Sequence, residues 1–125
     1  MPINCVGIDA VEIKRFLKVN SSIKQFSQKI FTQNEIGVIG RSQAGNFAAK
    51  EAIRKAFWEY IRLDFLDFEV LRSFSGRPIF ILVTPTLLSE SRIEIQSVDL
   101  SITYSSELAI ACAQVVFDFT ETQIQ

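Results

Sequence analysis

The sequence predicts an α+β fold in which helices pack on an antiparallel sheet. In the first half of the chain, apolar residues recur every three or four positions, which is the spacing of amphipathic helices. After Asp64 the pattern changes to the short apolar and alternating runs that are typical of strands. Helices followed by strands favour an α+β arrangement. A chain of 125 residues that is 48% hydrophobic is long enough for one core, so we expect a single domain over residues 1–125.

The N-terminal part is expected to hold one strand and three short helices. Residues 3–9 are mostly apolar and predict the strand. Residues 11–19 predict a short helix, and Asn20-Ser21-Ser22 can cap a second one that runs to Ile30. Thr32-Gln33-Asn34-Glu35 matches a capping box, in which the side chains of the first and last residues accept hydrogen bonds from each other's backbone N–H groups at the start of a helix. The helix that it would open should be short, because Gly37 and Gly40 weaken it.

The strongest helical signal lies at residues 43–61. The charged residues of this helix are expected on the part of its circumference that carries no apolar residues. They are Lys50, Glu51, Arg54, Lys55 and Glu59. The stripe has helical spacing and comprises Ala49, Ala52, Ile53, Ala56, Phe57 and Tyr60. The alanines of this stripe allow the helix to approach another layer of the fold closely.

The second half of the chain predicts four strands and one more helix. Strands are expected at residues 67–74 and 79–83, joined by the turn Ser75-Gly76-Arg77-Pro78. Residues 84–90 predict a short helix with proline at its first position. Alternation predicts a half-buried strand over residues 98–104, and a last strand is expected over residues 108–119.

Composition excludes several classes of function. The net charge is −1 and no dense cluster of Lys and Arg is present, so we expect neither nucleic-acid nor membrane-surface binding. The chain has no histidine, which rules out Ser-His-Asp and Cys-His catalysis and removes the commonest zinc ligand. Any metal should therefore be a hard cation held by carboxylates, and magnesium fits best.

The cysteines and apolar runs bear on localisation. Cys5 and Cys112 lie far apart, and no signal-peptide pattern precedes the first apolar segment, so we expect a protein of the reducing cytoplasm. The longest apolar run, residues 78–83, is too short to span a bilayer.

Asp9 closes the first predicted strand, directly after Gly7 and Ile8. A carboxylate at a strand end can point into a cleft, and Gly7 permits the close approach of another backbone or of a ligand. The alternative is that Asp9 only caps the helix that is expected two residues later.

Glu51 and Lys55 are four residues apart and therefore share one face of the long helix. In the functional interpretation, Glu51 binds a hard cation together with Asp9, while Lys55 meets phosphate oxygens. Magnesium takes one or two protein carboxylates and completes its shell with water and substrate phosphates, which suits this pair. The alternative is an exposed ion pair that contributes about 0.2–0.5 kcal/mol.

Two arginines also have alternative interpretations. Arg77 fits a plain hairpin turn, and it can also reach a phosphate. Arg15 forms a small basic face with Lys14 and Lys18, which is either simply solvated or receives an acidic protein helix.

Several stretches of the chain, taken together and in order, resemble the small phosphopantetheinyl transferases of the holo-acyl-carrier-protein synthase type. The most specific is Phe47-Ala48-Ala49-Lys50-Glu51-Ala52-Ile53-Arg54-Lys55-Ala56-Phe57. The others are weak singly and persuasive in series: residues 7–15, 30–35, 67–70, 76–78 and 101–105. They span nearly the whole chain, and its length also suits the family.

The resemblance implies a reaction and a set of roles. Such enzymes move the 4′-phosphopantetheine arm of coenzyme A onto a serine of an apo acyl carrier protein and release 3′,5′-ADP. By this resemblance Asp9 and Glu51 bind magnesium and Lys55 contacts phosphate, and these three are the catalytic candidates. The implied coenzyme A contacts are Lys55, Arg77, Pro78 and Tyr104. The resemblance also implies that Arg15 lies where the carrier docks. Members of the family usually form homotrimers with their active sites between subunits.

Three positions depart from the family pattern. Tyr104 stands where the family usually has histidine, and Asn46 where an arginine is common. Trp58-Glu59-Tyr60-Ile61 replaces a glycine-rich turn after the helix. These departures motivate a second hypothesis, in which the chain is a catalytically impaired family member that acts as a carrier-protein binding module.

Overall fold

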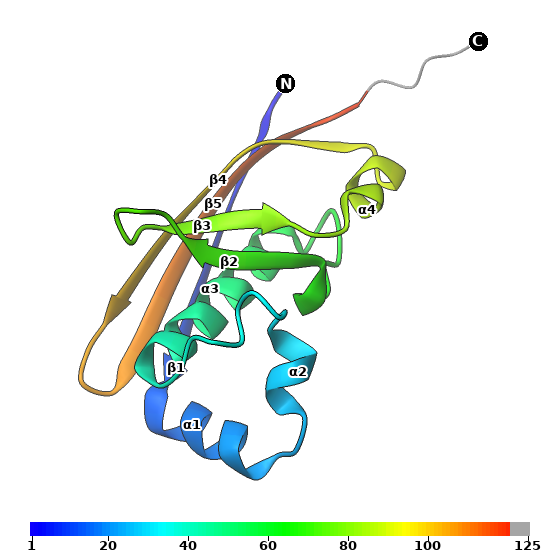
Figure 1. Cartoon of the computed structure of the whole chain (residues 1–125). Helices are drawn as coiled ribbons and strands as arrows, with labels where there is room; N and C mark the ends of the chain where they lie inside the picture. The colour runs from blue at the N-terminus through cyan, green and yellow to red at the C-terminus, as the bar shows by residue number, and fades with distance from the viewer. Residues whose placement is uncertain (121–125) are drawn as a thin grey trace.

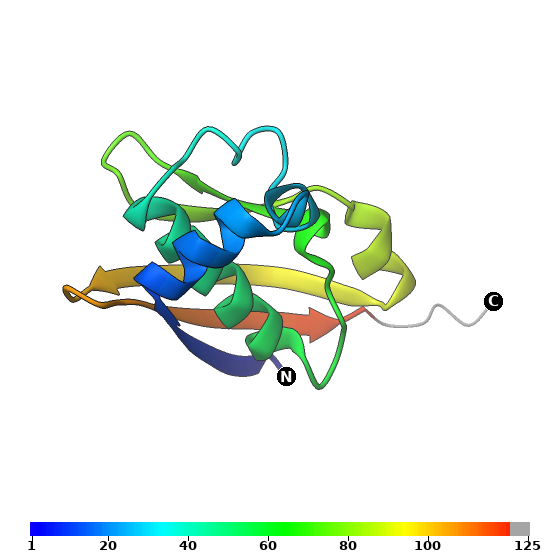
Figure 2. The same cartoon turned by 90° about the horizontal axis from the view of Figure 1, so that it is seen from below.

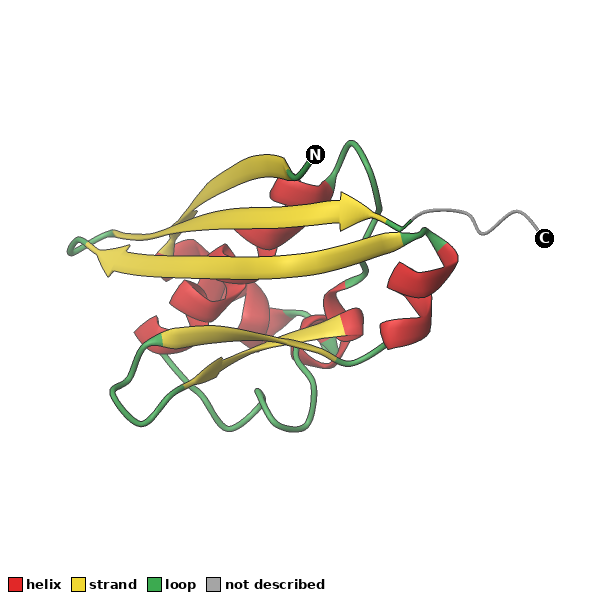
Figure 3. Ribbon diagram, turned by 90° about the horizontal axis from the view of Figure 1, so that it is seen from above, coloured by secondary structure: helices red, strands yellow, loops and turns green. Residues whose placement is uncertain are grey.

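The computed structural model describes residues 1–120 of the chain. Its helices pack on antiparallel strands, which confirms the predicted α+β class (Figure 1). The strands form two sheets rather than one, a three-stranded sheet and a separate two-stranded hairpin (Figure 3). Residues 121–125, the end of the predicted domain, lie outside the described residues.

The three-stranded sheet has the order β1-β5-β4, and both pairings are antiparallel. β5 (Leu108–Phe119) lies in the centre with the predicted bounds. β1 (Ile3–Glu12) and β4 (Ile93–Tyr104) flank it, and both are longer than expected. Alternate residues of β5 are buried against the helices, namely Ala109, Ala111, Ala113, Val115 and Phe117.

The hairpin consists of β2 (Phe68–Arg72) and β3 (Pro78–Leu82). A turn between the two strands is confirmed, but it spans residues 73–77, where Ser73 N–H donates to the Arg77 carbonyl at 2.9 Å, and Pro78 already belongs to β3. Gly76 has a φ of +86°, a left-handed conformation that glycine adopts without steric cost. Short helices lie on either side of the hairpin in sequence, the 3₁₀-helix η1 (Phe65–Asp67) and α4 (Pro85–Glu90).

The N-terminal helices differ from the sequence-based expectation. α1 (Ile13–Ser22) starts two residues late, because strand pairing with β5 continues through Glu12. It includes the residues expected to break it, and α2 (Phe26–Ile30) follows a break centred on Gln25, whose φ is +69°. The predicted helix after Thr32 is wrong. Residues 33–37 form only a turn, although the Glu35 carboxylate does accept the Thr32 backbone N–H at 3.0 Å, as a capping box requires.

The long helix, α3 (Arg41–Phe57), crosses the inner face of the three-stranded sheet, with α1 beside it (Figure 2). Its contact with β1 is backbone to backbone, because a Cβ built on Gly7 would lie 1.9 Å from the Ala52 carbonyl oxygen. The predicted role of Gly7 in permitting a close approach is therefore confirmed, and the approaching group is α3. No helix of residues 1–120 is long and apolar enough to cross a membrane.

A Gly7→Ala substitution is expected to lower the free energy of unfolding by roughly 1–3 kcal/mol, because the added methyl group forces β1 away from α3. Urea denaturation measures the loss. Gly37→Ala is the matched control, since a Cβ there meets nothing within 4 Å and its φ is not left-handed. Equal stability of the two variants would contradict the close contact between β1 and α3.

Candidate active site

Asp9 lies within β1, on the same strand face as Gly7, which contacts α3, and the buried Val11. Its carboxylate accepts a hydrogen bond from the Lys55 ammonium at 2.9 Å, and the same ammonium donates to the Ile8 carbonyl at 3.1 Å. The capping alternative is wrong, because the residue that precedes α1 is Glu12 and no side chain caps the helix. Asp9 therefore belongs to a cluster with α3.

Glu51 lies on the same side of α3, with about a quarter of its side chain exposed (27%). The described ion pairs do not include the expected exposed pair with Lys55, which turns to Asp9 instead. Arg54 approaches Glu51 at 3.9 Å. Burial raises the pKa of the Glu51 carboxyl, the negative charge of Asp9 raises it further, and Arg54 and Lys55 oppose the rise.

The two carboxylates line one cleft of about 460 Å³. Arg15 from α1 stands at this cleft, so the predicted basic face borders the predicted acidic pair. A third carboxylate, Glu12, also lines the cleft, and the rest of the wall is apolar and includes Phe16, Phe26 and Phe47. A neighbouring hollow of about 380 Å³ is lined by Glu51, Arg54, Lys55 and Trp58.

The donor set at this cleft fits a hard cation of the magnesium type. Among residues 1–120 no group of three or more metal-binding side chains converges, so at most two carboxylates meet at one point of the cleft. Magnesium accepts that number and leaves its other positions to water and phosphate. Burial and, after it, the negative charge of Asp9 raise the pKa of Glu51, and a bound cation relieves repulsion between two such carboxylates.

The other predicted contacts lie elsewhere in the chain. The Arg77 guanidinium, in the hairpin turn, pairs with Asp99 of β4 at 3.3 Å, and Pro78 begins β3. Tyr104 ends β4, where the Arg41 guanidinium stacks 4.5 Å from the centre of its ring. β4 and β1 flank β5, so they are roughly 10 Å apart, two strand spacings. One chain therefore does not bring these residues to Asp9 and Glu51.

Lys50 helps to position the helix that carries Glu51, and its place in the fold differs from the one expected from the sequence. It was expected on the charged circumference of the helix, but its side chain is fully buried and pairs with Glu35 at 2.6 Å. The Lys50 ammonium also donates to the carbonyls of Ile30 and Phe68, each at 2.9 Å. Its position three residues before Ile53, in the register of the apolar stripe, was the available signal.

The buried pair is completed by backbone contacts from three segments. One Glu35 oxygen accepts the Thr32 N–H, and the other accepts the Val70 N–H at 2.9 Å. Burial lowers the pKa of Lys50, while its bond to Glu35 opposes this shift. The network ties α3 to the end of α2, to the turn after it and to β2, so it fixes the rotation of the helix that carries Glu51.

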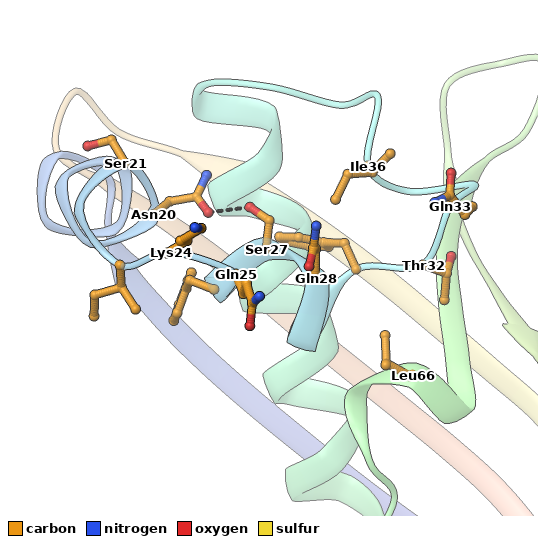
Figure 4. A pocket seen from close by; sticks show the side chains of 13 residues that line it. Asn20, Ser21, Lys24, Gln25, Ser27, Gln28, Thr32, Gln33, Ile36 and Leu66 are labelled. Atoms are coloured by element: carbon orange, nitrogen blue, oxygen red, sulfur yellow. Dashed lines mark hydrogen bonds between the residues drawn. The ribbon is translucent and has the colours of Figure 1, made fainter.

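A larger hollow of about 770 Å³ lies away from the predicted site residues. Figure 4 shows side chains from α1, α2 and the following turn around it, with Ser27 bonded to Asn20. Leu66 of η1 closes one side. None of the predicted catalytic, coenzyme A or carrier residues lines this hollow.

Comparisons with known proteins give consistent matches. Residues 5–113 match the model of the 4′-phosphopantetheinyl transferase superfamily. The chain is similar to the holo-[acyl-carrier-protein] synthase of Clostridium kluyveri, with 35% identity over 93% of this chain and 92% of the relative. For the holo-[acyl-carrier-protein] synthase of Clostridium perfringens, the identity is 38% over 85% of this chain and 88% of the relative.

A solved structure is similar over most of its length as well. It is the holo-[acyl-carrier-protein] synthase of Helicobacter pylori in complex with coenzyme A, which matches with a TM-score of 0.75 and 33% identity. The match covers 88% of this chain and 98% of that one.

Replacing Lys50 by Met is expected to lower the free energy of unfolding by roughly 3–5 kcal/mol, because Glu35 then stays buried without its partner. The double variant Lys50→Met/Glu35→Gln should recover part of the loss, since it removes the unpaired charge. Denaturant unfolding measures both.

The exposed pair between Arg77 and Asp99 provides the control for this measurement. Arg77→Met should change the unfolding free energy by about 1 kcal/mol or less. If Lys50→Met cost no more than Arg77→Met, the buried pair would not be the anchor of α3.

Proposed function

The chain belongs to the 4′-phosphopantetheinyl transferase superfamily, and we propose that it transfers the 4′-phosphopantetheine arm of coenzyme A to a serine of an apo acyl carrier protein, releasing 3′,5′-ADP. The family match confirms the resemblance drawn from the sequence motifs, and the chain is an enzyme of the holo-[acyl-carrier-protein] synthase type. The observation that carries the proposal is the convergence of Asp9, Glu51 and Lys55 on one edge of α3.

In this proposal Asp9 and Glu51 hold magnesium at the mouth of the cleft. When bound, magnesium would neutralise negative charge on the pyrophosphate of coenzyme A. This stabilises the additional negative charge that develops on the 3′,5′-ADP as it leaves. Lys55 contacts a phosphate oxygen, a role supported by the position of its ammonium beside Asp9. The whole activity is assigned to one domain over residues 1–125.

The chemical step is an in-line displacement at phosphorus. The serine oxygen of the carrier forms a bond to the phosphorus that bears the pantetheine arm, and the bond from that phosphorus to the ADP oxygen breaks. The serine proton passes to Glu51, which lines the cleft, or to a water molecule beside the metal site. Positioning and charge neutralisation carry this reaction, so the absence of histidine is no obstacle.

The carrier is proposed to dock on α1. Arg15 stands at the cleft, and Lys14 and Lys18 are exposed on the same helix. A basic helix beside the serine-accepting site suits an acidic carrier helix, because complementary charge steers association.

A homotrimer would complete the site. Arg77, Pro78 and Tyr104 lie at the β4 side of the sheet, whereas Asp9 lies on β1 at its other edge, so a second copy is proposed to supply them to coenzyme A. The outer sheet face supports such an assembly, because Val6 and Ile8 of the edge strand β1 are 65% and 61% exposed. Exposed apolar patches of this kind mark protein interfaces.

The transfer activity can be tested directly. Incubation with magnesium, coenzyme A and a panel of apo carrier proteins should add the mass of the arm to a carrier, as seen by mass spectrometry. Asp9→Asn and Glu51→Gln should each lower the rate roughly 100-fold or more, because the metal loses a ligand. Removal of magnesium with a chelator should have the same effect.

Glu90→Gln is the matched control, since this exposed carboxylate of α4 lies outside the cleft. Full activity in either cleft variant would remove the metal-site argument. If no carrier gained mass while a reference enzyme modified them all, the binding-module hypothesis would replace the transferase.

The assembly gives a separate prediction. Light scattering should report a particle about three times the 14.2 kDa mass of one chain. Ile8→Asp should dissociate it, because a charge then replaces an apolar contact on the outer sheet face. Ile39→Asp, at an Ile that is 78% exposed in the loop before α3, should leave it intact. A monomeric native protein would contradict the trimer.

A further inference from the structure

Trp58 stands at the edge of the proposed active site. It follows the last residue of α3 and keeps a right-handed helical conformation. The residue is 49% exposed and lines a hollow of about 380 Å³ together with Glu51, Arg54 and Lys55. A large aromatic side chain left half exposed next to a catalytic cluster is available to contact a ligand there.

Arg62 holds one face of this indole. Its guanidinium lies 3.6 Å from the centre of the ring, and its Nε donates to the Trp58 carbonyl at 2.8 Å. That bond uses one of the five N–H donors of the guanidinium. The stack therefore fixes the ring and places a cation beside it, and within residues 1–120 no other hydrogen bond of the Arg62 guanidinium is found.

The chemistry of the hollow matches a planar base that carries phosphates. Lys55 and Arg54 supply positive charge to its lining and Trp58 supplies an aromatic surface, while Arg62 places a further cation against that ring. Trp58 is three residues beyond Lys55, so the two positions are separated by roughly 4.5 Å along the helix axis. A ribose spans a comparable gap between the pyrophosphate and the base of a nucleotide.

We propose that Trp58 and Arg62 bind the nucleotide end of coenzyme A, with the indole stacked on the adenine ring and the guanidinium bonded to the 3′-phosphate. This inference rests on the proposed function, because it takes Lys55 and Glu51 as the pyrophosphate end of the same ligand. Base–aromatic stacking and arginine–phosphate pairing are established modes of nucleotide recognition. Trp58 is thus a binding residue that the sequence analysis did not assign.

Trp58 is the only tryptophan of the chain, so its fluorescence reports on this position alone. Titration with coenzyme A, dephospho-coenzyme A and 3′,5′-ADP, each in the presence of magnesium, should change the emission. 4′-Phosphopantetheine has the arm and a phosphate but no base, and it should leave the emission unchanged.

Variants separate the two contacts, with affinities measured by calorimetry. Trp58→Ala should weaken coenzyme A and dephospho-coenzyme A alike, by roughly fivefold to 100-fold, and Trp58→Phe should restore part of the loss. Arg62→Gln should weaken coenzyme A roughly tenfold and leave dephospho-coenzyme A, which lacks the 3′-phosphate, close to the native value. Lys24→Gln removes an exposed charge from the other hollow and should change neither affinity.

The outcomes distinguish this inference from the proposed function. If coenzyme A binds with unchanged emission, or binds Trp58→Ala as well as the native protein, the inference is wrong and the transferase stands. If Arg62→Gln weakens both ligands equally, the 3′-phosphate contact is wrong. If Trp58→Ala binds coenzyme A more tightly, the indole obstructs the site. If coenzyme A does not bind at all, both proposals fail.

Discussion

The buried ion pair between Lys50 and Glu35 is the interaction on which the site depends. A helix that packs through small side chains has little to define its rotation, because alanines offer similar surfaces at neighbouring positions. Here a charged group inside the core defines it, since the Lys50 ammonium meets Glu35 and the carbonyls of Ile30 and Phe68 only at one rotation. Leaving either charge unpaired is costly. Because Glu51 is the next residue, the same constraint directs it toward the cleft.

The distance between α3 and the sheet is set by a second constraint, the missing side chain of Gly7. Because the strand backbone touches the Ala52 carbonyl, Asp9 lies within reach of the ammonium of Lys55, about one helical turn after Ala52. A larger residue at position 7 would separate the two elements and therefore the carboxylate from its partners. Rotation and distance together place three charged side chains from segments far apart in sequence at one edge of the helix.

Local patterns predicted a large part of this structure. β5, the hairpin turn and the body of α3 follow from periodicity and turn residues, and the motif around Glu51 predicted the family. The errors came from interactions between distant segments. Asp9 was open to interpretation as a cap because the pairing of β1 with β5 through Glu12 is invisible in the local sequence. Thr32 starts no helix, since its hydroxyl bonds to Glu69 instead. Lys50 was misplaced because its partner is Glu35, fifteen residues earlier.

The four residues that replace the expected glycine-rich turn have different environments, and this bears on whether they disable the site. Ile61 is buried, and Tyr60 packs against the rings of Phe117 and Phe119 on β5. These two side chains therefore belong to the fold and leave the cleft free. Trp58 alone among the four lines the hollow beside Glu51 and Lys55. Of the four residues that replace the glycine-rich turn, only Trp58, whose ring is held by Arg62, is thus placed to contact the ligand. A ring fixed in this way has lost its side-chain freedom before the ligand arrives, so stacking a base on it costs less entropy than ordering a flexible turn.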